Sequence, residues 1–463
     1  MVIPSSTHLL SFPEEIIDRV CQQFCPCCSM RRSPRCFFDR DPMAIHGREC
    51  LLALSLTCKQ LRRISQPHLY HRPIGQDFFG FIDTIGRIPA LGQHVKELYA
   101  TPTMIRCFAC RHGYPNEFLA KCDKRYRTHL CDAAQRNPLV PFYGFRFPIP
   151  VLFGKTMGMA GTAIDCILSV VISLIPKIND LEICIQTDRI FWSVPSGYLQ
   201  NLKKLIVTVS ECFPADNLDS LAGLLDAAPQ LESLELAGLD LREPIKESEI
   251  ALCHGNVNEI ILRSCRIHTS RLEAIMRGFS KLQTFRFGAP EYWLVAGAAS
   301  ARPGVSYKIE DILMLRSDTL KHVTLDFLGG GIDGKLVLQD LSDMKALETL
   351  YIDSHILYCR WHQGRLSTKR ICQMLPESIK EFGLMECIYP LVQDEVMETI
   401  NISAQAFPLL KKLVVHLSIG IRQVDEDEET GEFASACEAY NIKFSPNVPR
   451  SSWNLTSPVP YRG

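Results

Sequence analysis

The 463-residue sequence lacks an excess of charge of either sign. Lysine and arginine together number 50, aspartate and glutamate number 51, and the formal net charge at pH 7 is −1. A chain with so little net charge has no general electrostatic attraction to nucleic acid or to an anionic membrane surface. We therefore expect no nucleic-acid partner and no membrane partner.

The sequence also lacks the signals of secretion and of membrane insertion. The start, Met1 to His8, has no basic stretch followed by a sustained apolar core. The most apolar run, Ala163 to Pro176, contains Asp165 and is shorter than the roughly twenty residues that span a bilayer. We expect a protein of the cytoplasm or nucleus, in which the 20 cysteines are reduced thiols.

Common catalytic motifs are absent as well. There is no Gly-x-x-x-x-Gly-Lys-Ser/Thr loop, no Gly-x-Ser-x-Gly turn and no His-Glu-x-x-His pair. Gly329 to Gly331 is not followed by a lysine or serine that starts a helix, so we interpret it as a flexible turn. We predict that the protein is not an enzyme, with no catalytic residue and no cofactor. A thiol-dependent enzyme is the alternative, because cysteine and histidine partners need not be close in sequence.

Two helical patterns lie near the N-terminus. In the first, Ser11 is placed to cap a helix, Glu14 to reach back to it, and Pro13 to occupy the first turn. The second runs from Leu51 to Tyr70 and predicts an amphipathic helix. Its apolar stripe consists of Leu52, Leu56, Leu61 and Ile64, and its polar face of Lys59, Gln60, Arg62 and Arg63. We expect two short helices joined by an insert.

The order of residues in these patterns resembles an F-box. Phe12-Pro13-Glu14-Glu15 is similar to the Leu-Pro-x-Glu start of that family, and Leu51 to Cys58 is similar to its Leu-Leu-x-Leu-x-x-Val-Cys-like helix. The closing Gln66-Pro67-x-Leu69-Tyr70 is similar to members from filamentous fungi. The resemblance implies an all-α F-box over residues 8–73 that binds a Skp-type adaptor and, through it, a cullin-RING ubiquitin ligase. The implied adaptor-binding residues are Phe12, Pro13, Ile16, Leu51, Leu52 and Leu54.

A hexamer with apolar residues at positions one, four and six recurs in the rest of the chain. All nine copies are polar at positions two and three, and their first residues lie about 24 to 38 positions apart. The copies start at Ile178, Leu202, Leu231, Val257, Leu282, Leu320, Leu347, Ile379 and Leu410. Helical patterns fill the gaps, including a Ser270–Glu273 capping box and an apolar group at Ile309, Ile312 and Leu313.

The hexamers predict short strands that stack, because no single copy can bury its apolar face alone. The array resembles the irregular leucine-rich repeats that often follow an F-box. We expect an α/β protein, with the F-box followed by a curved leucine-rich-repeat-like solenoid over residues 178–445. Residues 74–177 would start the solenoid with a helix at 78–88, a strand at 95–99 and an irregular insertion at 101–161. We expect an acidic loop at 425–429 and a disordered tail at 446–463.

The resemblance implies a non-catalytic substrate-recognition subunit of a Skp-cullin-F-box ubiquitin ligase. The alternatives are an F-box protein that acts outside the ligase and a zinc- or thiol-dependent enzyme. We place recognition of the protein substrate on the outward strand positions, with Arg263 and Arg286 roughly 5 Å apart and Tyr351 further along the face. An arginine pair favours an acidic or phosphorylated ligand. In the competing interpretation the two arginines pair with Glu235 and Glu259.

Two groups of cysteines could bind zinc. Cys25, Cys27, Cys28 and Cys36 form the first, and the second consists of Cys107, Cys110, Cys122 and Cys131 with His112 and His129 as substitutes. Neither has two well-spaced ligand pairs, so we predict no metal ion, and less than one equivalent of zinc in the purified protein. We interpret Cys166 and Cys265 as small core residues.

Overall fold

The chain divides into two compact units in a computed structural model. The first comprises residues 1–210 and 223–231, and the second comprises residues 211–222 and 232–463. The structure describes residues 9–29, 42–73, 78–100, 168–185, 194–209, 219–241, 244–245, 252–288, 309–327, 338–359, 364–365, 370–387, 389–417 and 426–445. The predicted insertion at 101–161, the second cysteine group, Cys36, Cys166, Gly329 to Gly331 and the tail at 446–463 lie outside these residues.

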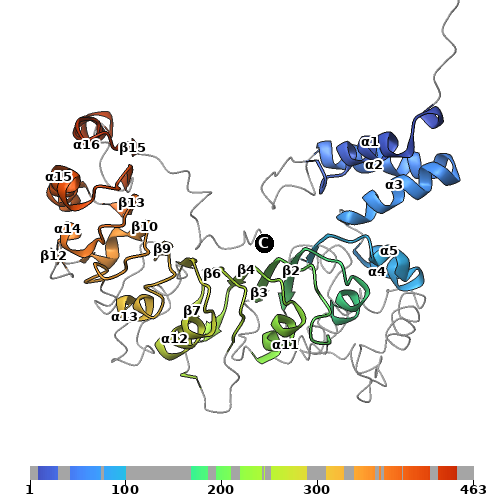
Figure 1. Cartoon of the computed structure of the whole chain (residues 1–463), viewed down its shortest axis with the longest axis horizontal. Coiled ribbons are helices and arrows are strands. Elements are labelled where there is room, and N and C mark those ends of the chain that lie inside the picture. Colours follow the sequence, from blue (N-terminus) through green and yellow to red (C-terminus); the bar gives the residue numbers. More distant parts are fainter. Residues whose placement is uncertain are drawn as a thin grey trace, which may run out of the picture. The chain divides into compact units, whose positions relative to one another are not determined.

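The first unit begins with three packed α-helices, which we call the helical module (residues 9–29 and 42–73; Figure 1). A 3-10 turn, η1 (Leu9–Ser11), precedes α1 (Glu14–Phe24), α2 (Pro42–Thr57) and α3 (Lys59–His71). Their shared core consists of Ile17, Cys21, Cys25, Leu51, Leu61 and Ile64. The end of α1 and the start of α2 approach closely at Gly47, where a Cβ atom would lie 2.3 Å from the Phe24 carbonyl oxygen. Any larger residue at this position would force the two segments apart.

The single helix predicted from Leu51 to Tyr70 is two helices. Cys58 separates them with an extended backbone (φ −155°, ψ 169°), and its thiol accepts a hydrogen bond from the Leu61 N–H. Because the helix axis changes at this residue, Leu52 and Leu56 are exposed whereas Leu61 and Ile64 are buried. The prediction of one apolar stripe through all four residues was wrong.

The predicted start of the first helix also differs. Residue Pro13 occupies the N-cap of α1 without a side-chain hydrogen bond, and Ser11 ends η1 instead of capping the helix. The Glu14 side chain does not reach back to Ser11. It pairs with Arg63 and accepts a hydrogen bond of 3.3 Å from Gln60, so it joins the start of α1 to α3.

The remainder of the first unit contains three parallel strands. Helices α4 (Phe78–Arg87) and α5 (Pro89–Gly92) lead into β1 (Glu97–Ala100), which confirms the predicted helix and strand in this region. Residues 168–174 are helical and precede β2 (Asp180–Ile185) and β3 (Lys204–Val209). The strand order is β1-β2-β3, with Glu97 opposite Asp180 and Asp180 opposite Lys204.

The second unit contributes eight strands to a parallel sheet, in the order β4-β6-β8-β9-β10-β13-β14-β15. They are β4 (Ser233–Ala237), β6 (Glu259–Arg263), β8 (Thr284–Gly288), β9 (His322–Asp326), β10 (Thr349–Asp353), β13 (Glu381–Cys387), β14 (Lys412–Leu417) and β15 (Lys443–Ser445). Two small sheets pair β5 (Asp240–Leu241) with β7 (Arg266–Ile267) and β11 (Tyr358–Cys359) with β12 (Gly364–Arg365).

The α-helices that connect the strands have 4 to 18 residues, and α12 and α13 lie on one face of the strands in this unit (Figure 1). The described helices are α11 (Asp219–Ala227), α12 (Thr269–Gly278), α13 (Ile309–Met314), η5 (Ser354–Ile356), α14 (Ile371–Met374), α15 (Tyr389–Ala406) and α16 (Glu426–Ala439). In the described part of the chain, no helix combines the length and apolar character needed to cross a membrane.

Every predicted hexamer contains a strand that starts at its third residue. The register joins equivalent positions, as in Thr284 opposite His322 and Glu381 opposite Lys412. Apolar positions one, four and six are buried throughout, for example Leu282, Phe285 and Phe287 at 2% exposure or less. The result confirms the hexamers as strands and the coarse class as mixed α/β, with N-terminal helices and a large parallel sheet.

A repeated backbone contact fixes this register. The carbonyl oxygen at position two accepts hydrogen bonds from the N–H groups at positions two and three of the neighbouring strand. In one copy, the Gln283 oxygen accepts from Lys321 at 2.8 Å and from His322 at 2.9 Å. In the next copy, the Lys321 carbonyl oxygen accepts from the N–H groups of Glu348 and Thr349. A one-residue slip would break these contacts and expose the apolar face, so register is strongly specified.

Two details of the helices correct the sequence interpretation. The N-cap of α12 is His268, whose side chain accepts from the Ser270 N–H, so the Ser270–Glu273 capping box was wrong. Residues 426–429 of the acidic run are helical and begin α16 instead of forming a loop. Acidic residues favour the first turn of a helix, where they oppose the positive end of its dipole.

Candidate functional site

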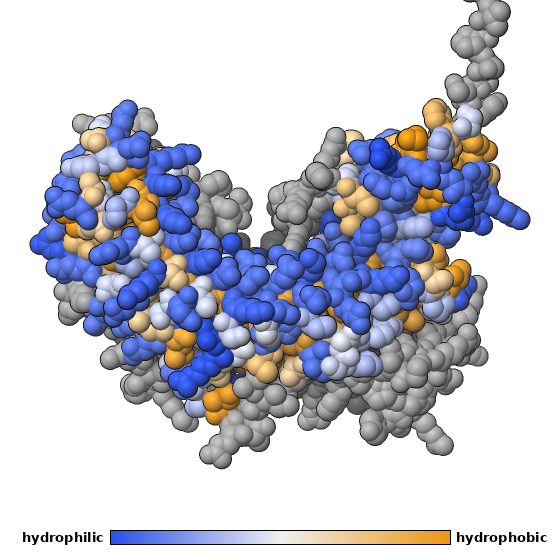
Figure 2. All heavy atoms as spheres, viewed as in Figure 1, coloured by the Kyte–Doolittle hydropathy of each residue, from blue (hydrophilic) through white to orange (hydrophobic). Residues whose placement is uncertain are grey.

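Most exposed large apolar side chains of the described residues belong to the helical module. Nine of the twelve lie there, namely Leu9, Leu10, Phe12, Ile16, Val20, Met43, Ile45, Leu52 and Leu56. The other three are Ile88, Leu409 and Tyr440. Figure 2 shows hydrophobic side chains gathered over this helical part of the chain. Such a concentration marks a candidate surface for binding another protein.

The exposed residues follow one stripe on each of two helical segments. On α1, Ile16 and Val20 are four residues apart and therefore share a face, and Phe12 lies in the bend between η1 and α1. On α2, Ile45, Leu52 and Leu56 follow the same helical spacing.

Four of the six predicted adaptor-binding residues are exposed, and two are not. Residues Phe12, Ile16 and Leu52 have exposed fractions of 44%, 42% and 48%, and Pro13 is exposed too. Leu51 is 1% exposed within the core, and Leu54 is half-buried against that core. Successive helical residues point about 100° apart, so Leu51 and Leu52 cannot both face outward. We therefore correct the prediction by removing Leu51 and Leu54 from the surface.

The predicted substrate-binding arginines are engaged in ion pairs. Arg263 lies 2.7 Å from Glu235, and Arg286 lies 3.7 Å from Glu259, which confirms the competing interpretation of their contacts. Residue Arg286 is opposite Ile261 in the sheet, so Arg263 lies two residues further along the neighbouring strand. Their positions are therefore staggered, and acidic neighbours already offset their charges.

The third predicted substrate-binding residue, Tyr351, is 1% exposed. Its ring lies across Gly383, where a Cβ atom would be 2.2 Å from the ring carbon Cδ1. The hydroxyl donates to the Glu381 carboxylate, and the Lys412 Nζ atom lies 3.3 Å from the hydroxyl oxygen. Burial, followed by the hydrogen bond to Glu381, raises the pKa of Tyr351. The prediction of an outward recognition residue was wrong, because glycine on the neighbouring strand lets the ring lie flat.

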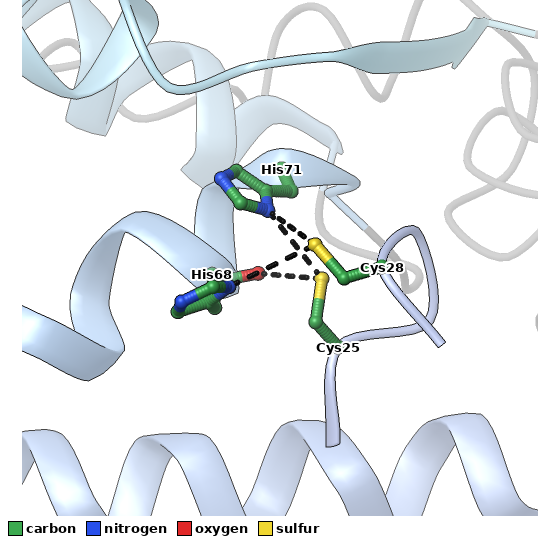
Figure 3. Close-up of side chains that lie close together, drawn as sticks. All are labelled: Cys25, Cys28, His68 and His71. Carbon is green, nitrogen blue, oxygen red and sulfur yellow. Dashed lines mark hydrogen bonds between the residues drawn. The ribbon is translucent and has the colours of Figure 1, made fainter. Parts of the chain in front are cut away.

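A cluster of Cys25, Cys28, His68 and His71 lies inside the helical module (Figure 3). One potential ligand atom from each of the four residues falls within 4.8 Å of all the others. The Cys28 sulfur lies 3.2 Å from His71 Nδ1 and 3.9 Å from His68 Nδ1, and the Cys25 sulfur lies 3.5 Å from His71 Nδ1. The four side chains converge on one point, as the ligands of a metal ion do.

Two local structures produce this convergence. Cys25 is the C-cap of helix α1, and the chain turns there because the Cys25 carbonyl accepts from the N–H groups of Cys28 at 3.1 Å and Ser29 at 2.9 Å. That turn brings the two thiols to one side. The two histidines lie in the last turn of α3, three residues apart and therefore on one helical face. Both histidines are buried.

A carboxylate orients one of the histidines. His68 Nε2 lies 2.8 Å from Asp18 Oδ1, and the Gln22 amide donates to Asp18 Oδ2 at 2.7 Å. The hydrogen bond with His68 lowers the pKa of Asp18. Because Nε2 is held by this carboxylate, Nδ1 is the ring nitrogen that faces the thiols.

Hydrogen bonds within the cluster lower the pKa of two thiols, Cys25 and Cys28. Hydrogen bonding with Cys27, and then with His68 and His71, lowers the pKa of Cys25 to about 7, against the opposing effects of Cys28 and burial. Hydrogen bonds with Cys25 and Cys27 also lower the pKa of Cys28. By contrast, burial raises the pKa of Cys21 to about 11 and that of Cys265 to about 12. Cys21 and Cys265 are core thiols, as we predicted for Cys265, whereas Cys25 and Cys28 have the character of ligands.

No protein-family model matches the chain, and no curated protein is significantly similar to it. Its function therefore has to be argued from these sites.

Sequence reasoning missed the two histidines of the cluster. It sought partners for the cysteines within the segment from Cys25 to Cys36, whereas His68 and His71 lie 40 or more residues after Cys28. The available signal was the matching spacing of Cys25-x-x-Cys28 and His68-x-x-His71, since paired ligands at short spacing are typical of structural zinc sites.

Proposed function

We propose that the protein is the non-catalytic substrate-recognition subunit of a Skp-cullin-F-box ubiquitin ligase. The observation that carries the proposal is the pair of apolar stripes on α1 and α2 of the helical module. The stripes include Ile16 and Leu52, and the exposed Phe12 directly precedes α1; the F-box resemblance rests on all three residues.

The exposed stripes supply a physical reason for binding. Full burial of a large apolar side chain stabilises by roughly 1.5–3 kcal/mol, so covering residues that are nearly half exposed contributes about 1 kcal/mol each. A Skp-type adaptor that covers both stripes would gain this energy from several side chains at once. Helical modules of this kind bind through such apolar anchors.

We further propose that the parallel strands form a curved leucine-rich-repeat-like solenoid that holds the protein substrate. The shared register and the repeated carbonyl contact at position two support this proposal, because equivalent residues meet in successive strands. The chain would then act by proximity, raising the effective concentration of a substrate lysine near the ubiquitin-conjugating enzyme. Such a subunit would work in the cytoplasm, the nucleus or both.

We do not assign substrate recognition to Arg263, Arg286 and Tyr351. All three side chains already have partners within the sheet, which removes the argument for an acidic or phosphorylated ligand.

The test is co-expression of the full chain with a Skp-type adaptor. An Ile16→Asp, Leu52→Lys double variant should bind the adaptor at least about 100-fold more weakly, because both anchors become charged. A Leu409→Lys variant is the matched control, since Leu409 is 44% exposed and lies outside the helical module. Undiminished adaptor binding by a folded double variant would contradict the proposed surface.

A second measurement separates a ligase subunit from an F-box protein that acts outside the ligase. Proteins that co-purify with the wild-type chain should be ubiquitinated when cullin-RING components are added, and they should accumulate in cells that carry the double variant. If the adaptor binds but these proteins are neither modified nor stabilised, the alternative function is favoured.

A further inference from the structure

We propose that Cys25, Cys28, His68 and His71 bind one structural Zn²⁺ ion. The proposal is independent of adaptor binding and opposes the expectation of no metal that the sequence suggested. It rests on the geometry, charge and surroundings of the four side chains.

The distances within the cluster fit tetrahedral zinc. Zinc–sulfur bonds of roughly 2.3 Å and zinc–nitrogen bonds of roughly 2.0–2.1 Å place sulfur and nitrogen about 3.6 Å apart in a tetrahedron. Three sulfur–nitrogen distances, from Cys28 to both histidines and from Cys25 to His71, range from 3.2 to 3.9 Å and bracket this value, and all four ligand atoms lie within 4.8 Å of one another. An ion could bind with only small adjustments of the side chains.

The charges of the donors also fit. Two thiolates balance the double positive charge of Zn²⁺, and two neutral imidazoles add none, so the complete centre is neutral. A neutral centre suits this site, because Cys25, His68 and His71 are all buried and an unbalanced charge there would be costly. Sulfur and imidazole donors favour zinc over magnesium or calcium, which take oxygen ligands.

Neighbouring side chains already orient one of the proposed zinc ligands. A zinc-binding histidine usually donates its second ring N–H to a carboxylate, and Asp18 occupies that position beside His68. Gln22 in turn orients Asp18. Four protein donors complete a tetrahedron and leave no position for substrate or water, so this arrangement indicates a structural centre.

The ion would connect the end of α1 to the last turn of α3. In the described residues of the module, the shared core consists of six buried apolar residues with six partly buried ones packed against it. Small domains with little core commonly depend on a metal, and the binding free energy of the metal is then part of the folding free energy. We infer that zinc maintains the arrangement of α1 and α3.

The experiment uses the full chain, purified under reducing conditions without chelator. Elemental analysis should find one zinc per chain. Replacement of zinc by Co²⁺ should give the intense visible bands of tetrahedral cobalt together with a thiolate-to-cobalt charge-transfer band. Removal of the ion should reduce helical circular dichroism, and addition of Zn²⁺ should restore it.

Three variants test the ligands. Cys28→Ser and His71→Ala should lose stoichiometric zinc, whereas Cys50→Ser should retain it. Cys50 is the matched control, because it is a half-buried free cysteine on α2 of the same module but is not part of the four-residue cluster. If the first two variants fail to fold, the cobalt spectrum of the wild-type chain alone tests whether the site binds a metal ion.

Two results would overturn the proposal. The first is that the wild-type chain, reduced and folded, binds neither zinc nor cobalt. The other is zinc retained by a folded Cys28→Ser variant at full stoichiometry. Adaptor binding has no part in these measurements, so their failure and the failure of the proposed function are distinguishable.

Discussion

The helical module and the parallel strands use apolar residues in different ways. In the strands, hexamer positions one, four and six are buried in copy after copy, and outward charges such as Arg263 and Arg286 have acidic neighbours. The module exposes nine large apolar side chains and buries a charge-bearing cluster of cysteine and histidine instead. Outward charges of the strands pair with each other, whereas the module leaves apolar side chains exposed, and we propose that a partner covers them.

The contrast in apolar exposure follows from how many positions each region can enclose. A stack of strands gains a new buried layer with every copy, because each strand covers its neighbour. Three short helices enclose few positions, so they cannot bury every apolar residue that the sequence places on them. The predictions below test this contrast, from the largest expected effect to the smallest.

Neighbouring leucines of α2 should differ sharply in their contribution to stability. Leu51→Ala should destabilise the helical module by about 2–5 kcal/mol, because Leu51 is 1% exposed and its removal leaves a cavity. Leu52→Ala should change stability by less than about 0.5 kcal/mol, since Leu52 is 48% exposed. Urea unfolding followed by hydrogen exchange in α2 measures both variants. Equal losses would show that the two faces of α2 are not distinct.

The carboxylate beside His68 should tune zinc affinity without serving as a ligand. Asp18→Asn should weaken zinc binding by about 10- to 100-fold, or roughly 1.4–2.7 kcal/mol, because the histidine loses the carboxylate that orients it. Competition with a chromophoric chelator gives the affinity. Glu15→Gln on the same helix removes the same charge from an exposed position and should leave affinity unchanged. An equal loss in both variants would assign the effect to net charge.

The outward charges of the sheet should contribute least. A double-mutant cycle on Arg286→Ala and Glu259→Ala should give a coupling energy of about 0.2–1 kcal/mol, which decreases at high salt. The expected value is small because the Arg286 side chain is 37% exposed and the two groups are 3.7 Å apart. A salt-independent coupling of several kcal/mol would show that this surface is a stabilising network and not a solvated one.

Local patterns in the sequence determined much of the fold. The apolar positions of the hexamers predicted the starts of nine strands, β2, β3, β4, β6, β8, β9, β10, β13 and β14, to within two residues, because alternation and burial act within a few residues of the chain. The same reasoning predicted α4 and α13, whereas the exposed positions of Phe12, Ile16 and Leu52 were predicted from the F-box resemblance. It failed at Cys58, since a thiol that caps a helix has no strong local pattern.

Only the tertiary structure decided which distant residues meet. The packing of α1 against α3 places Cys25 and Cys28 beside His68 and His71, and no spacing rule specifies that approach across 40 residues. Tyr351 illustrates the same limit, because the alternation of its strand points it outward but the glycine on a neighbouring strand lets its ring lie flat and buried. Side-chain direction follows from the residue's own backbone, whereas its surroundings depend on segments that are remote in sequence.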